Sequence, residues 1–586
     1  MGWRSGPART IAGILLVALV ALGALSNASA APAGAAQGLI IKLRDAGDGS
    51  AAAPGRLQRL LADAGVSARA RGLGRRSQHL DFGRRLSAED VERIAARLAQ
   101  QSEVEWVVPN ERDRRLTTPS DPLFGALASS SGQWWLFPAG GGNANDIEDR
   151  RRGVPGVQSA WQTTTGSTAP VVAVLDTGIT AHPDLVAGVL PGRDFVSTVE
   201  YANDGDGWDA DPSDPGDWVS DADRSSFPTL FGDCAVDNSS WHGTVIAGML
   251  AAGTNNGLGA AALNWNARVL PVRVAGKCGA EVADIIDGMR WAAGLQVLDA
   301  AGRTVPRNLN PARVLNISFG GSAPCNAAYQ ETIDELAAIG VVVVAAAGND
   351  HGAVTRPASC RGVLGVAALN RDGFKSSYSN FGPEVAIATV GGDPRQVGGW
   401  GIELGDDGLL TLANAGLRAP GAGTYARTAG TSFAAPVVAG VAGLMLAVNP
   451  TLSAQQLIDG VQRSARPHVV SPKIAQCSAQ NPGRCICTTS SCGAGILDAA
   501  AALAYAANPS GYVPPVRQAE VIDNADVDAA VAMGSDLPAN VATPSLAPAG
   551  DSGGGALGLS WLAALALAVA ALSWRRPRSR GPARGT

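Results

Sequence analysis

The segment Val171-Val172-Ala173-Val174-Leu175-Asp176-Thr177-Gly178 decides the fold of this chain. Its first five residues form an unbroken apolar run, which is typical of a strand buried on both faces of a sheet. A carboxylate and a turn glycine follow directly, so the strand delivers Asp176 to its carboxyl end. Similar apolar runs occur at 269–274, 314–317 and 341–347, with helical stretches at 281–298 and 327–339. The pattern predicts an α/β fold with a doubly wound, mostly parallel sheet and functional groups at the carboxyl ends of its strands.

Two further segments carry side chains suited to proton transfer and nucleophilic attack. His242 begins the sequence His242-Gly243-Thr244-Val245-Ile246-Ala247-Gly248, and an imidazole titrates near neutral pH, so it can accept and return a proton. Ser432 lies in Gly430-Thr431-Ser432-Phe433-Ala434-Ala435-Pro436, at the start of an apolar helical stretch whose N–H groups favour negative charge. Taken singly, His182 competes with His242, and a serine in this place is an ordinary helix cap.

Two other strand ends are suited to holding a substrate. The segment Asn316-Ile317-Ser318-Phe319-Gly320-Gly321 ends a strand edge in Ser-x-Gly, which leaves backbone donors and acceptors for an extended peptide. Asn349 follows a buried strand and a glycine, where its amide can donate to a developing oxyanion. The alternative for Asn349 is a turn cap with no chemical role.

Together these segments resemble the subtilisin (subtilase) family over about residues 117–507. Asp176, His242 and Ser432 follow the chain order Asp, His, Ser of subtilisin. The resemblance implies a three-layer serine endopeptidase that needs no cofactor for catalysis. It also implies roles: Ser432 is the nucleophile, His242 the general base and then acid, and Asp176 its orienting group. Asn349 completes the oxyanion hole with the Ser432 backbone N–H, and Ser318 and Gly320 line the substrate strand. Val245 departs from the family, because many members carry a second histidine there.

Two other functions fit parts of the pattern. A non-catalytic surface adhesin could use the same fold, although the full set of motifs argues against it. An esterase of the α/β-hydrolase type needs G-x-S-x-G, and Ala434 stands where the second glycine belongs. The side-chain preference of an endopeptidase is left open, with Thr355-Arg356-Pro357 as one candidate pocket wall.

The chain divides into six predicted segments. Residues 1–30 read as a signal peptide ending in Ala28-Ser29-Ala30, with an uncleaved anchor as the alternative. A small Arg-rich α+β unit follows, with a helix capped by Ser87, and resembles the subtilase propeptide, an inhibitor and folding chaperone of its own protease. We expect self-cleavage between about Arg115 and Thr118. The segments are 1–30, 31–116 (propeptide), 117–507 (catalytic domain), 508–555 (linker), 556–574 (apolar span) and 575–586 (basic tail).

The C-terminus predicts a bacterial protein that is secreted or displayed at the cell surface. Asp551-Ser552-Gly553-Gly554-Gly555 precedes an apolar span and an arginine cluster, and this order resembles the GlyGly-CTERM sorting signal, which a rhomboid-like protease removes. The alternative is a permanent anchor, because the span is long enough to cross a bilayer. The arginines would then stay cytoplasmic.

Cysteines and charge set further limits. Export to an oxidising compartment predicts that the eight cysteines form disulfides. We expect Cys234 with Cys278 and Cys325 with Cys360; the last four, Cys477, Cys485, Cys487 and Cys492, allow three connectivities. Residues 117–574 carry a formal charge of −16, which argues against a nucleic-acid partner, because phosphate binding needs clustered Lys and Arg. The expected partners are polypeptide substrates and the propeptide, and the expected state is a monomer.

Structural calcium is the one metal that the sequence suggests. The segment 203–211 is dense in aspartates, among them Asp204 and Asp206, and calcium prefers six to eight oxygen ligands. The EF-hand pattern is incomplete, so a solvated acidic turn is the alternative. Asp184 and Asn255 resemble positions near a calcium site of the family.

Overall fold

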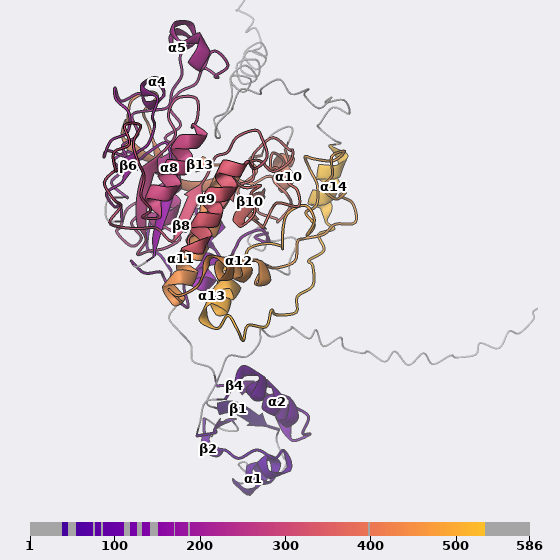
Figure 1. Cartoon of the computed structure of the whole chain (residues 1–586). Helices are drawn as coiled ribbons and strands as arrows, with labels where there is room; N and C mark the ends of the chain where they lie inside the picture. The colour runs from indigo at the N-terminus through magenta and orange to yellow at the C-terminus, as the bar shows by residue number, and fades with distance from the viewer. Residues whose placement is uncertain are drawn as a thin grey trace, which may run out of the picture. The chain divides into compact units, whose positions relative to one another are not determined.

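The computed structural model describes residues 38–44, 54–73, 77–83, 86–110, 118–125, 132–140, 150–168, 170–185, 188–395 and 399–533. The chain forms two compact units, Met1–Arg115 and Leu116–Thr586 (Figure 1). The predicted signal peptide, apolar span and basic tail lie outside the described residues.

The first unit is a small α+β domain. Its sheet has the order β2-β3-β1-β4, with antiparallel pairing throughout. Leu39, Ile41, Val91 and Leu98 are buried between this sheet and the helices. The predicted cap is present, because the Asp90 N–H donates to Ser87 Oγ at 3.1 Å. The elements are β1 Gly38–Leu43, α1 Pro54–Asp63, β2 Arg69–Gly72, β3 Ser77–Asp81, α2 Ala88–Ala99 and β4 Val104–Pro109.

The second unit is built on a seven-stranded sheet of order β11-β10-β9-β8-β5-β7-β6. Every pairing within it is parallel. On one side of β5 the chain continues outward from β8 to β11, and on the other side β7 lies between β5 and the edge strand β6, which confirms the predicted doubly wound sheet. The strands are β5 Val171–Asp176, β6 Arg193–Asp194, β7 Arg268–Arg273, β8 Val314–Ile317, β9 Val342–Ala346, β10 Val363–Leu369 and β11 Ile387–Val390.

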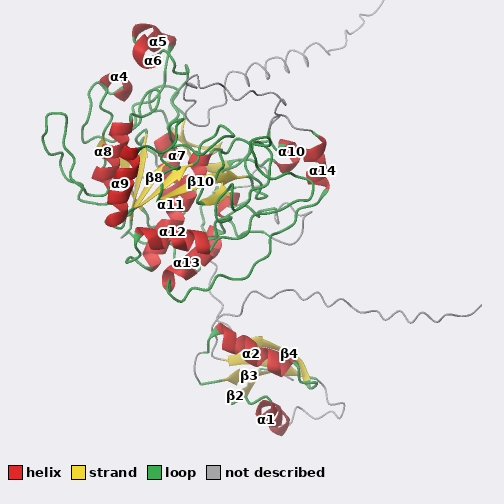
Figure 2. Ribbon diagram, turned by 45° about the vertical axis from the view of Figure 1, so that its right-hand side comes forward, coloured by secondary structure: helices red, strands yellow, loops and turns green. Residues whose placement is uncertain are grey.

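Helices cover both faces of this sheet. Val172 and Val174 of β5 pack into one core, with α7, α11, α12 and α13, while Ala173 and Leu175 pack into the other, with α8 and α9. Figures 1 and 2 show α8 and α9 side by side over one face. The helices are α7 His242–Ala251, α8 Val282–Ala292, α9 Ala327–Ala338, α11 Thr431–Val448, α12 Ala454–Arg463 and α13 Ala499–Ala507.

The remaining elements are short. A two-stranded antiparallel ribbon pairs β12 with β13. The bounds are η1 Trp134–Leu136, α3 Val157–Ala160, α4 Val199–Ala202, α5 Asp221–Ser226, α6 Pro228–Phe231, α10 Gly401–Leu404, α14 Ala525–Ala532, β12 Leu409–Asn414 and β13 Gly423–Thr428.

The helix α11 is the central core helix. Among the described residues it alone is long and apolar enough to cross a membrane, yet 89% of its residues are buried inside the protein. Its hydrophobicity therefore reflects packing against β8, β9 and β10 rather than contact with lipid.

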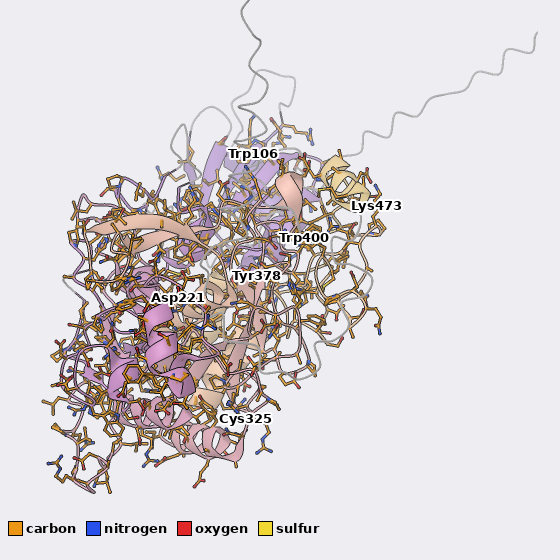
Figure 3. All side chains as sticks on the ribbon, turned by 90° about the horizontal axis from the view of Figure 1, so that it is seen from above. Trp106, Asp221, Cys325, Tyr378, Trp400 and Lys473 are labelled. Atoms are coloured by element: carbon orange, nitrogen blue, oxygen red, sulfur yellow. A yellow bond between two sulfur atoms is a disulfide. The ribbon has the colours of Figure 1, made fainter. Side chains whose placement is uncertain are left out.

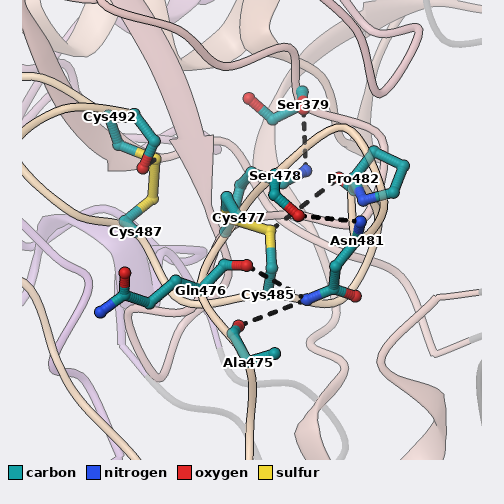
Figure 4. The surroundings of a disulfide bond; sticks show 12 residues. Ser379, Ala475, Gln476, Cys477, Ser478, Asn481, Pro482, Cys485, Cys487 and Cys492 are labelled. Carbon is teal, nitrogen blue, oxygen red and sulfur yellow. Dashed lines mark hydrogen bonds between the residues drawn. A yellow bond between two sulfur atoms is a disulfide. The ribbon is translucent and has the colours of Figure 1, made fainter.

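All eight cysteines form disulfides. The two predicted pairs are confirmed: Cys234 with Cys278, and Cys325 with Cys360, whose Cys325 is marked in Figure 3. The four cysteines left open pair locally, as Cys477 with Cys485 and Cys487 with Cys492 (Figure 4).

The structure differs from the predicted linker at residues 508–533. Ile522 N donates to Val470 O at 2.8 Å, and Val527 and Ala530 of α14 are buried. Figures 1 and 2 show α14 beside α10. Backbone hydrogen bonds and a few apolar side chains hold this segment on the domain. It has no continuous apolar face, so its sequence shows no hydrophobic periodicity.

Candidate active site

The end of β5 and the start of α7 place a carboxylate and an imidazole in contact. Asp176 is the last residue of β5 and is 1% exposed, and His242 is the first residue of α7. His242 Nδ1 lies 2.8 and 3.0 Å from the two Asp176 carboxylate oxygens. The Thr177 N–H also donates to this carboxylate at 2.8 Å. The carboxylate thus fixes the ring so that Nδ1 donates and Nε2 is left to accept a proton.

Three carboxylates tune the proton affinity of this imidazole. Burial lowers the pKa of His242, but Asp176, followed by Asp217 and Asp214, raises it, and the net shift is upward. His242 Nε2 makes no hydrogen bond to any described residue. The protonated ring is therefore stabilised, and the nitrogen opposite Asp176 is available.

Ser432 lies at the second residue of α11, beside this ring. The ring of its neighbour Phe433 is 5.5 Å from the His242 ring, centroid to centroid. Ser318 Oγ donates to the Ser432 carbonyl at 2.8 Å. That carbonyl is free to accept because Pro436, four residues on, has no N–H for the usual helical bond. Within the described residues Ser432 Oγ makes no hydrogen bond to His242, and such contacts often tighten only when substrate binds.

The carboxamide of Asn349 is held by the residue before Ser432. Its Oδ1 accepts from Thr431 N and from Thr431 Oγ1, both at 2.9 Å. Because Oδ1 is used, the Nδ2 donors are left, and they make no hydrogen bond to another described residue. The Ser432 N–H, at the second helical position, likewise has no intrahelical partner. Two donors of the kind that binds an oxyanion are thus held together.

Ser318 and Gly320 follow β8 directly. Gly320 must be a glycine, because a Cβ there would lie 2.3 Å from the Arg356 carbonyl oxygen. In the described part of the chain, the backbone N–H and C=O groups of Phe319 and Gly320 make no backbone hydrogen bond. This edge is free to pair with an extended peptide.

Comparison with known proteins agrees with this geometry. Residues 167–525, more than half of the chain, match the model of the subtilase family. The chain belongs to the subtilase family. It is 35% identical over 428 residues to an extracellular protease of Xanthomonas campestris pv. campestris, covering 72% of this chain and 63% of that protein. It is 36% identical over 373 residues to an extracellular basic protease of Dichelobacter nodosus, covering 63% of this chain and 55% of that protein.

The matched regions thus span less than two thirds of these two relatives. A solved structure of a protease from Pseudoalteromonas arctica is also similar, with 39% identity and a TM-score of 0.54. It covers 67% of this chain and 100% of the solved one. The match to the subtilase fold therefore extends over the whole of a solved protease chain.

The structure of this subtilase adds a carboxylate that the sequence did not reveal. Asp217 accepts from Ser240 N at 2.6 Å and from Ser240 Oγ at 2.7 Å. Ser240 Oγ in turn accepts from the His242 backbone N–H at 3.2 Å. Asp217 lies 25 positions before His242 in an irregular loop, so no periodicity or spacing connects the two. Only a motif of the loop itself, Asp214-Pro215-Gly216-Asp217, could have drawn attention to it.

Asp214 supports the other side of the same turn. Its carboxylate accepts from Thr177 Oγ1 at 2.7 Å, and Thr177 Oγ1 accepts from the Gly243 N–H at 3.1 Å. Burial, with Asp217 nearby, raises the pKa of Asp214 to about 7. Asp176, Asp214 and Asp217 thus surround the start of α7, and two of them act through a hydroxyl.

The metal candidates separate into two groups. Asp184 accepts from Asn256 Nδ2, Ala260 N and Tyr425 Oη, at 2.6, 2.9 and 3.2 Å. Close by, Asp121 accepts from the Asn255 N–H at 2.9 Å. Burial, and to a lesser extent the charge of Asp184, raises the pKa of Asp121. Neither carboxylate forms an ion pair within the described residues.

In the second group, around the loop 203–211, an arginine side chain already supplies the positive charge. Arg273, buried in β7, forms ion pairs with Asp194 and, at 2.5 Å, with Asp204. Asp206 is exposed, and its N–H donates to Asp204 Oδ1 at 3.2 Å. Because Arg273 pairs with Asp204, the loop 203–211 does not need a metal to balance this carboxylate.

The only described group of three or more histidines, cysteines or acids close enough to share an ion is Cys477, Cys487 and Cys492, which are disulfide-bonded.

We expect Asp217→Asn to move the acidic limb of the pH–activity profile to lower pH. Loss of this negative charge lowers the pKa of His242, so the ring stays neutral at more acidic pH, and a shift of about 0.3–1 pH unit is expected. The measurement is the pH profile of kcat/KM on a peptide substrate. The matched control is Asp221→Asn, on an exposed position of α5, which should leave the profile unchanged. An unchanged acidic limb in Asp217→Asn would show that this carboxylate is only structural.

Proposed function

We propose that this chain is a serine endopeptidase that hydrolyses protein substrates through an acyl-enzyme and is made as a secreted zymogen. The observation that carries the proposal is the contact between His242 Nδ1 and Asp176, beside the first turn of the helix that carries Ser432. Membership of the subtilase family and the printed names of its protease relatives support it.

The residues divide the reaction between them. Ser432 Oγ attacks the scissile carbonyl carbon while His242 Nε2 accepts its proton, and Asp176 stabilises the imidazolium that forms. The carbonyl oxygen becomes an oxyanion that receives hydrogen bonds from Asn349 Nδ2 and the Ser432 N–H. His242 then gives the proton to the leaving amine, and a water repeats the sequence on the acyl-enzyme. The reaction needs no cofactor.

The substrate is held by strand addition. Phe319 and Gly320 offer backbone groups that make no backbone hydrogen bond to any described residue, and Ser318 ties this segment to the Ser432 carbonyl. Because backbone pairing reads any extended peptide, the site is suited to polypeptides rather than to small esters.

Removing one oxyanion donor gives a sharp test. Asn349→Ala should lower kcat by about 10²–10³-fold with little change in KM, the loss known for such a donor in subtilisin itself.

Labelling by a fluorophosphonate probe should disappear in Ser432→Ala and in His242→Ala. Labelling of the wild type that persists in His242→Ala would contradict the triad, and a wild type that neither labels nor cleaves casein would favour an adhesin.

The N-terminal unit supports the zymogen part of the proposal. Trp106 and Val108 of β4 are 38% and 44% exposed, and their neighbour Ile40 is half-buried on the same sheet face. An exposed apolar sheet face is typical of a surface that binds another protein. We infer that residues 31–116 act as an intramolecular inhibitor and chaperone.

We expect self-maturation at about Arg115–Thr118, a segment that lies mostly outside the described residues. Purified wild-type chain should lose its N-terminal unit, whereas Ser432→Ala should keep it. N-terminal sequencing and intact mass measure both. If Ser432→Ala reaches the same mature N-terminus in the absence of another protease, self-cleavage is wrong, although the endopeptidase proposal would stand.

Structural calcium is proposed at Asp184 and Asp121. Two neighbouring carboxylates that lack an ion pair among the described residues, with the Asn255 carboxamide beside them, match the oxygen-rich sets that calcium prefers. The calcium would stabilise the fold and would take no part in the chemistry.

Calcium should raise the melting temperature of Ser432→Ala protein, a background that avoids self-digestion. Binding to the folded state stabilises it, by about 2.7 kcal/mol at one hundred times the dissociation constant. Asp184→Asn should abolish the rise, and Asp206→Asn should keep it because Arg273 already balances that loop. Differential scanning calorimetry measures both, and a rise that depends on Asp206 would move the site to 203–211.

We further propose that the protein is secreted or surface-bound and acts as a monomer. The extracellular names of its relatives support secretion. The signal peptide and the GlyGly-CTERM-like tail with its membrane span remain predictions, since both lie outside the described residues. Mass spectrometry of both termini of the secreted product tests them.

A further inference from the structure

Arg356 places a guanidinium group against the substrate-binding edge. Its backbone runs beside that edge: Gly321 N donates to Arg356 O at 3.1 Å, and Arg356 N donates to Ala323 O at 2.9 Å. A Cβ added at Gly321 would lie 3.0 Å from Arg356 Nε and 3.3 Å from Nη2. The guanidinium therefore packs directly on the Cα of Gly321, which has no side chain to separate it from a bound peptide.

This guanidinium has no anionic partner in the described part of the chain. Arg356 forms no ion pair there, and its Nε is buried without a hydrogen bond. Tyr329 is nearby, but burial raises the pKa of its hydroxyl to about 12 even though Arg356 lowers it, so it carries no charge at neutral pH. Arg273, which is buried in the same domain, is by contrast paired with carboxylates. A partly buried cation without a partner has a high affinity for a carboxylate.

The backbone that carries Arg356 is held by cross-links. Cys325 and Cys360 form a disulfide that joins the segment after the substrate edge to the segment that carries Arg356. Cys325 N also donates to Ser359 Oγ at 2.9 Å, and Thr355 N donates to Ala347 O at 3.3 Å. A side chain that starts from so rigid a backbone loses less conformational entropy when it binds a ligand.

We propose that Arg356 is a specificity-determining residue that selects peptides with an aspartate or glutamate about three residues from the scissile bond. The spacing follows from the edge: Ser318 contacts Ser432, and Gly321 lies three residues further on, about 10 Å along an extended chain. The proposal rests on the endopeptidase function. The selection is local, because residues 117–574 carry a net negative charge and would otherwise disfavour acidic peptides.

The test compares kcat/KM on fluorogenic peptides that carry glutamate or glutamine at each of the four positions on either side of the scissile bond. For the wild-type enzyme, kcat/KM should be about tenfold to a hundredfold higher with glutamate than with glutamine at one position, about three residues from the scissile bond. Arg356→Gln should remove this preference, and Arg356→Lys should keep part of it, because an ammonium cannot form the bidentate contact. The control is Arg361→Gln, an exposed arginine beside the same disulfide, which should keep the full preference.

Each outcome is decisive. A wild-type profile without a glutamate preference overturns the proposal, whatever the variants do. A preference that survives in Arg356→Gln overturns it as well, since another group would then be the selector. Fluorophosphonate labelling checks that each variant has a folded site. A wild-type enzyme that neither labels nor cleaves any peptide instead refutes the endopeptidase function, so the two failures are distinguishable.

Discussion

The hydrogen bond between His242 Nδ1 and Asp176 ties the first turn of α7 to the end of β5. Both partners are buried, so neither charge nor hydrogen-bonding capacity can be satisfied by water if they separate. The strand supplies the rigidity, because β5 lies between β7 and β8 in the middle of the sheet. Asp214 and Asp217 hold the same turn of α7, because they reach its backbone N–H groups through the hydroxyls of Thr177 and Ser240. Three carboxylates thus converge on one turn. The site is therefore anchored to the centre of the sheet.

A proline inside the central helix serves the same arrangement. In most helices Pro436 would be a defect, because it removes one backbone hydrogen bond. In α11 the carbonyl left over is that of Ser432, and Ser318 Oγ donates to it. The carbonyl that lacks its helical hydrogen bond thus connects the helix that carries the proposed nucleophile to the segment proposed to hold the substrate. The carboxamide of Asn349 is fixed in a similar way, by Thr431. The residues proposed for catalysis and substrate binding thus position one another, either directly or through the residue next to them in the chain.

The sequence was sufficient for the sheet, and it singled out most residues of the candidate site, because both depend on local signals. Buried parallel strands such as Val171–Leu175 are continuous apolar runs, and each functional residue follows a strand or begins a helix. Contacts between distant polar residues leave no such signal. Asp217 and Arg273 gave none, since a carboxylate in a loop and an arginine in a strand look ordinary until the chain is folded. The segment 508–533 was mistaken for a linker for the related reason that scattered backbone bonds hold it. The pairing of Cys477, Cys485, Cys487 and Cys492 likewise required coordinates.

The ion pairs of Arg273 have a consequence for how the protein tolerates its surroundings. An acidic loop that depends on a dissolved ion comes apart when that ion is scarce or is taken up by a chelator. Arg273 is covalently part of the chain, so its positive charge cannot be washed out of the loop that holds Asp204. The proposed secreted enzyme would meet dilute and chemically variable water, and a tethered counter-charge would keep this corner of the domain folded there.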